Sequence, residues 1–340
     1  MITNMDGKLL NFEDILIEPQ FSNVRSRKDV DVSTDFLGLK LSLPVMNSNM
    51  DTVASPALCR ALADYGTVGT LHRFWSIEEN VQAFKDSIFN ERKPIVSIGI
   101  GNEETKRAQA LHSAGAEIFM LDVAHAANIA VVVMYNDLVQ LYPDAKFIVG
   151  DFGTGIEIIE FLKRVNRIPD AFKVGIGIGS VCHTRMVTGV GNTALSCLLD
   201  CAEILNDREI DIKLVLDGGV HEIGDIAKAL VAGADLIISG SMFAGTDETP
   251  GIIFYPKDSI GNILEPIKVY RGSASQESYV AQNKEASWRA PEGTSVLIPY
   301  KGLVLPVLNN INGGLRSACS YVNAFNLNEL RANAKFRFLK

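Results

Sequence analysis

Eight short apolar runs, most of them separated by segments of helical character, dominate this sequence. Parallel strands that are buried on both faces appear in a sequence as continuous apolar runs. The eight runs are Pro44–Ser48, Thr67–His72, Pro94–Ile100, Glu117–Val123, Lys146–Asp151, Phe172–Gly177, Lys213–Gly218 and Asp235–Gly240. The helical segments are Ser55–Tyr65, Ile77–Asn90, Glu103–Ala114, Ala127–Tyr142, Gly155–Asn166, Asn192–Leu205 and Ile223–Ala232.

Repeated strand–helix alternation of this kind predicts a (β/α)8 barrel. The alternative is a doubly wound open sheet, which needs fewer strands and usually carries a glycine-rich turn after the first one. No G-x-G-x-x-G motif follows an early strand here. With 340 residues, of which 47 % are apolar and 21 % charged, the chain can bury one large core. We therefore expect a single barrel domain over residues 1–340.

Charge and cysteine content exclude several classes of protein. The net charge is −8 and no long run of Lys or Arg occurs, which argues against a nucleic-acid surface but not against a small phosphate ligand. We expect no signal peptide and no membrane span. Five scattered cysteines predict a reduced, cytoplasmic protein without a disulfide framework. Cys197 and Cys201 are spaced as two buried thiols on one helix face rather than as a metal site.

The region from 246 to 300 interrupts the barrel pattern. It is rich in Gly, Pro, Ser and charged residues and follows the eighth predicted strand. Such an insertion lies at the carboxyl end of the barrel strands, where catalysis takes place in this architecture, so we expect a mobile flap. Within it, Asp258–Leu264 predicts a small hairpin, and Glu277–Trp288 a segment that is partly helical or mobile.

The loop after the sixth strand, Gly177–Arg185, is the most informative candidate site. Its glycines allow the backbone to approach a ligand or an ion closely. A cysteine at the mouth of a barrel can be exposed and can act as a nucleophile, so we expect Cys182 to have this role. The alternative is a flexible glycine-rich turn with an incidental cysteine. Pairing with the adjacent His183 is disfavoured because neighbouring side chains seldom face each other.

The loops after strands seven and eight indicate a phosphate and sugar site. Asp217-Gly218-Gly219 and Gly240-Ser241 stand where barrel enzymes commonly bind phosphate, and an acidic residue can accept hydrogen bonds from ribose hydroxyls. The alternative is a pair of tight turns with Asp217 as a helix cap. Asn47–Asp51, His72-Arg73 and Asp122 also follow predicted strands, and they can be either functional or structural.

Six separated motifs resemble the family of IMP dehydrogenases and GMP reductases, which are purine-nucleotide oxidoreductases on a (β/α)8 barrel. The motifs are Phe12–Leu16, Asn49–Val53, the Cys182 loop, Leu216–Gly219, Gly240–Met242 and Gly313–Ser317. Three features are similar to the reductase branch. The segment from His72 to Pro94 has no regulatory insert, Thr188–Gly191 precedes Leu195-Ser196, and Gly272–Gly293 has the length of a reductase flap. Pro291–Gly293 and Pro299–Gly302 look more like a dehydrogenase.

The resemblance implies a mechanism and a set of substrate-contacting residues. Cys182 would attack C2 of GMP, ammonia would leave, and NADPH would deliver hydride to the covalent thioimidate and so release IMP. Thr184 and Glu292 would form the acid–base pair. The implied substrate-binding residues are Met50, Ser180, Asp217, Gly218, Gly219, Gly240, Ser241, Gly272, Ser273, Ala274, Arg289 and Gly293.

The resemblance also implies a cofactor site, a cation site and an assembly. The cofactor-contacting positions would be Ser26, Arg27, Arg73, Asp122, Val123, Ala124 and Ser317. A potassium ion would be held by loop carbonyls of Gly177, Gly179, Cys182 and Arg185. A homotetramer whose subunits share the cofactor sites is implied as well.

Several positions depart from the family pattern. Ile178 replaces Pro, His183 replaces Thr, Asp151 replaces Asn, His125-Ala126 replaces Asn-Gly, Arg73 replaces Lys, and Ser273 replaces Met. These changes leave open a modified or deoxy purine nucleotide as substrate. An IMP dehydrogenase that lacks the regulatory insert and a catalytically silent nucleotide-binding homologue also stay open as alternatives.

Overall fold

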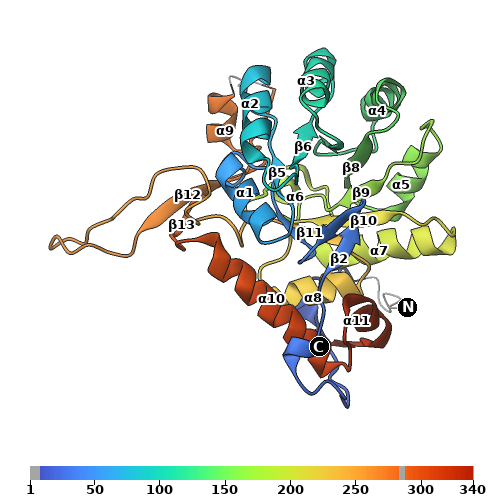
Figure 1. Ribbon diagram of the computed structural model, residues 1–340. Helices are drawn as coiled ribbons and strands as arrows, with labels where there is room; N and C mark the ends of the chain where they lie inside the picture. Colours follow the sequence, from blue (N-terminus) through green and yellow to red (C-terminus); the bar gives the residue numbers. More distant parts are fainter. Residues whose placement is uncertain (1–7, 283–287, 340) are drawn as a thin grey trace.

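A parallel eight-stranded barrel forms the body of the molecule (Figure 1). The computed structural model describes residues 8–282 and 288–339. The sheet order is β4-β11-β10-β9-β8-β7-β6-β5. Its strands are β4 (Val45–Asn47), β5 (Thr70–Leu71), β6 (Ile95–Ile98), β7 (Ile118–Asp122), β8 (Lys146–Phe152), β9 (Ala171–Val174), β10 (Lys213–Asp217) and β11 (Leu236–Ser239). Six of them lie within their predicted apolar runs, and β8 and β9 each extend one residue beyond theirs, to Phe152 and Ala171, so the predicted barrel is confirmed.

The helices surround this barrel. Seven of them correspond to the predicted segments: α1 (Pro56–Asp64), α2 (Ile77–Ser87), α3 (Asn102–Ser113), α4 (Ile129–Leu141), α5 (Gly155–Leu162), α7 (Ala194–Asp207) and α8 (Ile223–Val231). Side-chain caps mark several starts, since Ser55, Ser76 and Thr154 each accept a bond from the third residue beyond. The ring is completed by α10 (Val304–Tyr321), which packs against α8 and α1 and which the sequence pattern did not indicate.

A side chain bridges the two strands at the ends of the sheet order, β4 and β5. Asn47 is fully buried and stands where the backbone pairing stops. Its amide nitrogen donates to Thr70 O at 2.9 Å, and its amide oxygen accepts from Thr70 N–H at 2.9 Å. The carboxamide therefore replaces the missing pair of backbone hydrogen bonds and closes the barrel.

The amino ends of the strands are covered by elements that the sequence analysis missed. The antiparallel pair β2 (Thr34–Phe36) and β3 (Leu39–Leu41) brings Phe36 and Leu41 onto the inner barrel core. The chain ends meet where β1 (Ile15–Ile17) pairs with β14 (Phe336–Phe338). Three further elements outside the predicted pattern pack against helices of the ring: η1 (Phe12–Asp14) and α11 (Leu327–Asn333) contact α8, and η2 (Arg27–Asp29) contacts α10. The carboxyl ends of the strands are thereby left as the open face.

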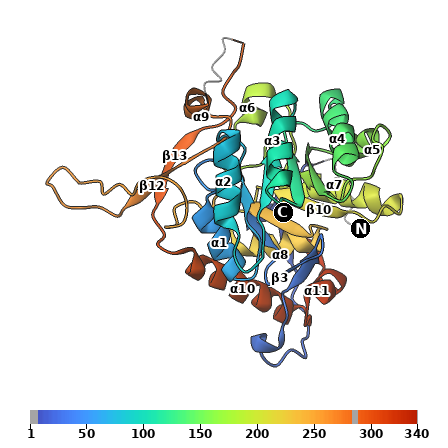
Figure 2. The same cartoon turned by 45° about the horizontal axis from the view of Figure 1, so that its top comes forward.

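The insertion after β11 forms an arm that projects from the barrel in both ribbon views (Figures 1 and 2). Its base is the antiparallel pair β12 (Ile267–Arg271) and β13 (Ser295–Pro299), which we did not predict. The predicted hairpin at Asp258–Leu264 is present as a turn beside a Lys257–Ile263 bridge. Part of Glu277–Trp288 is helical, in α9 (Gln276–Ala281), and part of it, 283–287, lies outside the described residues.

No helix within the described parts of the chain has the length and apolar character needed to cross a membrane.

Candidate active site

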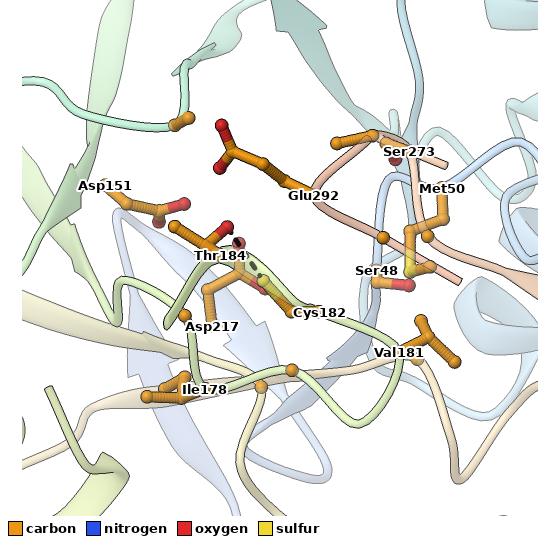
Figure 3. Close-up of a pocket in the computed structure, with 18 of the residues that line it drawn as sticks. Ser48, Met50, Asp151, Ile178, Val181, Cys182, Thr184, Asp217, Ser273 and Glu292 are labelled. Carbon is orange, nitrogen blue, oxygen red and sulfur yellow. Dashed lines mark hydrogen bonds between the residues drawn. The ribbon is translucent and has the colours of Figure 1, made fainter. Parts of the chain in front are cut away.

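A cavity of about 730 Å³ opens at the carboxyl ends of the barrel strands (Figure 3). Its volume lies in the range of sites that bind small molecules and cofactors. Most of the predicted site residues line it: Met50, Arg73, Asp122, Val123, Ala124, Gly177, Gly179, Ser180, Cys182, Thr184, Asp217, Gly218, Gly219, Gly240, Ser241, Gly272, Ser273, Ala274, Arg289, Glu292 and Gly293. The topology thus brings together residues from nearly the whole length of the chain.

The predicted nucleophile lies in the loop that leads from β9 to the short helix α6 (Thr184–Thr188). Cys182 is half-buried, and its Sγ is 3.2 Å from Thr184 Oγ1, an interaction drawn as a dashed line in Figure 3. At Gly177 the backbone has φ +77°, and an added Cβ would lie 2.6 Å from Arg185 Cγ. Only glycine satisfies both constraints, so Gly177 determines the backbone path of the loop that carries Cys182. His183 is absent from the cavity lining, so its pairing with Cys182 is not supported.

Backbone hydrogen bonds join this loop to the far end of the insertion. His183 N–H donates to Glu292 O at 2.7 Å, and Thr294 N–H donates to Val181 O at 3.0 Å. An isolated bridge links Cys182 to Gly293. The carboxyl group of Glu292, the hydroxyl of Thr184 and the thiol of Cys182 therefore all lie at one cavity wall, as Figure 3 shows. The predicted catalytic residues are brought together by segments about 110 positions apart in the chain.

The floor of the cavity holds three carboxylates around one lysine, which the sequence analysis missed. Lys173 on β9 is completely buried, and its Nζ is 2.9 Å from Asp122, 2.5 Å from Asp151 and 2.5 Å from Asp217. Burial alone would lower the pKa of Lys173, but the three carboxylates raise it well above its usual value. A lone charged residue inside an otherwise apolar strand run was the available signal, and a buried lysine needs such partners.

Asp217 therefore has a different structural role from a helix cap. The N-cap of α8 is Glu222, while the carboxylate of Asp217 is bound to Lys173. One oxygen of that carboxylate is engaged by the ammonium, and the side chain lines the cavity. The capping interpretation is wrong, and the interpretation as a ligand-facing acid stays open.

Tyr270 on β12 is a further cavity residue that we did not predict. Its hydroxyl lies 3.4 Å from Ser180 Oγ and 3.8 Å from Met50 Sδ. The backbone of Gly240 approaches so closely that a Cβ there would overlap this hydroxyl and lie 3.0 Å from Ser48 Oγ. Ser48 Oγ is buried and has no hydrogen-bond partner among the described residues. Residues of the loops after β4, β9 and β11 thus meet the Tyr270 hydroxyl of β12 in the cavity wall.

Four predicted site residues do not line the cavity. Ser26 and Arg27 belong to the start of η2, Ser317 lies on α10, and Arg185 follows Thr184 in α6. Arg27 and Ser317 lie near each other, since Arg316 donates to Arg27 O at 3.1 Å. The structure therefore brings the η2 and α10 residues together, but away from the cavity of the same chain.

Other polar residues at strand ends have structural roles. Asp51 forms an ion pair with Arg271 at 2.5 Å. His72 is buried, and desolvation together with the charge of Arg107 lowers its pKa to about 3, so it is neutral. All five cysteines are free, and Cys197 and Cys201 are buried on α7, as expected of structural thiols.

Comparison with known proteins agrees with these observations. A sequence model described as the IMP dehydrogenase / GMP reductase domain matches residues 9–339. A GMP reductase of Caenorhabditis elegans is 33 % identical over 96 % of this chain and 91 % of its own. An inosine 5′-monophosphate dehydrogenase structure from Legionella pneumophila has a TM-score of 0.83 and 34 % identity, covering 98 % of this chain and 99 % of that one.

A structure of the C318A variant of Trypanosoma brucei GMP reductase, in complex with guanosine 5′-monophosphate, has a TM-score of 0.87. It is 24 % identical and covers 98 % of this chain and 96 % of that chain, so it supports the fold alone.

Fold and site define an enzyme, an α/β-barrel oxidoreductase with a cysteine at the mouth of its barrel. The chain belongs to the IMP dehydrogenase / GMP reductase family. Within that family it is similar to the GMP reductases.

Proposed function

We propose that this enzyme catalyses the NADPH-dependent reductive deamination of GMP to IMP and ammonia. The observation that carries the proposal is the meeting of Cys182, Thr184 and Glu292 at one wall of a cavity of ligand size. The similarity to GMP reductases over 96 % of the chain supports this substrate. The C318A variant from Trypanosoma brucei was solved with guanosine 5′-monophosphate bound, and its barrel has the same fold.

The chemistry begins with a covalent bond between Cys182 Sγ and C2 of the purine. The amino group at C2 leaves as ammonia after it accepts a proton, and a thioimidate remains on Cys182. When bound, NADPH supplies the hydride that C2 then accepts, and the C–S bond breaks to give IMP and the free thiolate. Covalent attachment divides one difficult displacement into two easier steps.

Thr184 and Glu292 provide the proton in this scheme. The Thr184 hydroxyl lies 3.2 Å from Cys182 Sγ, within reach of a group that would leave from the attacked carbon, and the Glu292 carboxyl on the same cavity wall would exchange the proton with it. Glu292 is held by the bond from His183 N–H to its carbonyl and by its own N–H, which donates to Ala274 O at 2.9 Å. Both acid–base partners are thus fixed relative to the nucleophile.

The nucleotide would lie along the rest of the cavity. Asp217 would accept hydrogen bonds from the ribose, and Gly219, Gly240 and Ser241 would bind the phosphate through backbone N–H groups. Gly218, whose N–H donates to Ile238 O at 3.1 Å, would contact the nucleotide through a backbone that has no side chain in the way. The remaining contacts would come from Met50, Ser180, Gly272, Ser273, Ala274, Arg289 and Gly293, which also line the cavity.

The cofactor would need residues from two parts of the molecule. Arg73, Asp122, Val123 and Ala124 line the cavity and would face the nicotinamide end. Ser26, Arg27 and Ser317 lie outside it. We propose that they complete the cofactor site of a neighbouring subunit in a homotetramer. A potassium ion would be coordinated by the carbonyls of Gly177, Gly179, Cys182 and Arg185, since this loop offers uncharged oxygen ligands on a backbone that glycine allows to turn sharply.

Incubation with GMP and NADPH, followed by the absorbance of the reduced nicotinamide, tests the proposal. We expect the absorbance to fall and IMP to accumulate in equal amount. The Cys182→Ala variant should lose turnover to below detection and still bind GMP in calorimetry, because the thiol forms the covalent bond but only one contact of the nucleotide. Turnover that survives this substitution would overturn the mechanism.

The alternative is an IMP dehydrogenase activity, favoured by the 34 % identity to the Legionella enzyme and by Pro291–Gly293. An increase of the reduced-nicotinamide absorbance with IMP and NAD⁺ would identify it. A modified or deoxy purine nucleotide is the other candidate, because Ser273 lines the cavity at a position that departs from the family pattern. Comparing GMP with dGMP as substrates distinguishes this case.

A further inference from the structure

Lys173 is surrounded by more negative charge than it can neutralise. Its ammonium has three N–H donors, and Asp122, Asp151 and Asp217 accept one each. The three carboxylates come within 4.8 Å of one another, which would suit a metal ion, but Lys173 Nζ occupies the position that an ion would take. The group is therefore a closed ion cluster at the floor of the cavity.

The three carboxylates carry one negative charge more than Lys173 and the nearby Arg73 can balance together. The charge of Arg73 acts on Asp122, so two cations face three carboxylates. The cluster is shielded from water, since the side chains of the three acids are only 17 to 21 % exposed and Lys173 is not exposed at all. An uncompensated charge in such a place is costly, and binding one proton removes it.

Among the three acids, Asp151 is the one that binds this proton most readily. Burial and the charges of Asp217 and Asp122 raise its pKa well above the usual value, against the opposing effect of Lys173. Burial would raise the pKa of Asp122 too, but Lys173, Arg73 and Asn49 lower it below its usual value. Asp151 has Lys173 as its only cationic partner among the described residues and lies between two like charges.

The geometry also determines which oxygen carries the proton. Lys173 donates to Asp151 Oδ1, which must therefore be the carbonyl oxygen, so the hydroxyl is Oδ2. Asp151 follows the cis peptide bond at Gly150, within the irregular stretch of the β8–β9 pairing, and its side chain lines the cavity. A neutral carboxyl group of this kind has one acceptor facing Lys173 and one donor left for a ligand, as an asparagine amide would have.

We propose that Asp151 is a further ligand-binding residue of this site, which carries a proton at neutral pH and donates a hydrogen bond from Oδ2 to an oxygen of the bound ligand. The inference rests on the proposed function, because it takes the ligands to be a purine nucleotide and a nicotinamide cofactor. Asp151 lies between Asp217, on the ribose side, and Asp122, on the cofactor side, so the acceptor is a hydroxyl or carbonyl oxygen of one of these two molecules.

Infrared spectroscopy of the ligand-free enzyme tests the proton directly. The difference spectrum between wild type and Asp151→Asn at pH 6 should contain the C=O band of a protonated carboxylic acid, and raising the pH should remove that band from the wild type. The Glu117→Gln variant, in which the altered carboxyl is exposed at the opposite end of the barrel, serves as a control and should keep the band. A spectrum without such a band would overturn the proposal, whatever the ligands prove to be.

Calorimetric titration with GMP and with NADPH, between pH 6 and pH 9, tests the donor. Because only the neutral form donates, the wild-type affinity for one ligand should fall about five- to tenfold over the pH range in which the infrared band of Asp151 disappears. Asp151→Asn should match the wild type at pH 6 and lose this pH dependence, whereas Asp151→Ala should bind about five- to tenfold more weakly at pH 6. The ligand that is affected identifies the acceptor.

Two outcomes of the titration are decisive against the inference. An Asp151→Asn variant that keeps the wild-type pH dependence would overturn it, as would an Asp151→Ala variant with unchanged affinity for both ligands. If the wild type bound neither GMP nor NADPH, the proposed function would fail instead, and the infrared measurement would still decide the protonation of Asp151. The wild-type infrared titration needs no variant, so poor folding of a mutant leaves the test intact.

Discussion

At the scale of single residues, the proposed chemistry depends on the Thr184 hydroxyl, which faces Cys182 Sγ. Replacing Thr184 by Val keeps the shape and removes the only hydroxyl within reach of Cys182 Sγ among the described residues. Without a relay for the proton, we expect kcat with GMP to fall about 10²- to 10⁴-fold while the Kd for GMP stays within about twofold. Thr188→Val is the matched control, since that hydroxyl is exposed and bonds to Thr184 O in the same helix. Equal losses in both variants would point to distortion of α6 rather than to proton transfer.

The sequence placed Cys182 and Thr184, the proposed catalytic residues, in the cavity lining more readily than it revealed the residues around them. Cys182 and Thr184 are close in the chain and lie in a glycine-rich loop, so local reasoning could find them. Lys173 was hidden, because a single charged residue in an apolar run reads as part of the strand. Tyr270 was missed for a different reason: it reaches the cavity from β12, an element whose place follows from long-range pairing. Propensity and periodicity do not carry that information.

At the scale of elements, the Asn47 amide joins β4 to β5, next to the Thr67 hydroxyl, which donates to Leu43 O and Val45 O. Replacing Asn47 by Leu would leave the N–H and C=O of Thr70 buried without partners, and each unsatisfied group costs about 1–3 kcal/mol. We expect the free energy of unfolding to fall by about 2–4 kcal/mol in denaturant titration. Asn47→Asp can still accept from Thr70 N–H, but its second oxygen would face Thr70 O, so its loss of stability should shrink at low pH, where the protonated carboxyl can donate to that carbonyl. A loss below about 0.5 kcal/mol would show that the strands are held without this amide.

The elements that the sequence predicted are those with a local cause. The strand runs of the barrel and the seven helices between them were found at nearly their true positions, because each of these segments shows its character in a short stretch of sequence. The pairs β2–β3, β12–β13 and β1–β14 escaped prediction, since the strands of β12–β13 and β1–β14 are separated by long stretches of chain and those of β2–β3 are only three residues long. The two ends of the chain are thus joined by pairing that no short window of sequence contains.

At the scale of the whole molecule, the projecting arm exposes several large apolar side chains along its length. Ile252, Tyr255, Ile260 and Ile263 are 59 to 82 % exposed, and a patch of large apolar side chains on a projection usually marks a protein interface. A second copy of the chain is the partner that the proposed tetramer requires. We expect the double substitution Ile260→Asp and Ile263→Asp to shift sedimentation towards smaller species. The control Leu141→Asp, on the exposed side of α4, should not change the sedimentation of the assembly.

The same arm variant also distinguishes the two ligand sites. Every proposed GMP contact lines the cavity of one chain, whereas Ser26, Arg27 and Ser317 lie outside it. If these residues serve a neighbouring subunit, disassembly should raise the Kd for NADPH about tenfold or more, because several contacts are lost at once, and leave the Kd for GMP nearly unchanged. Arg27→Ala in the intact assembly should reproduce the weaker NADPH binding alone. Tight NADPH binding by the disassembled variant would mean that a single chain contains the complete cofactor site, and that η2 and α10 have another role.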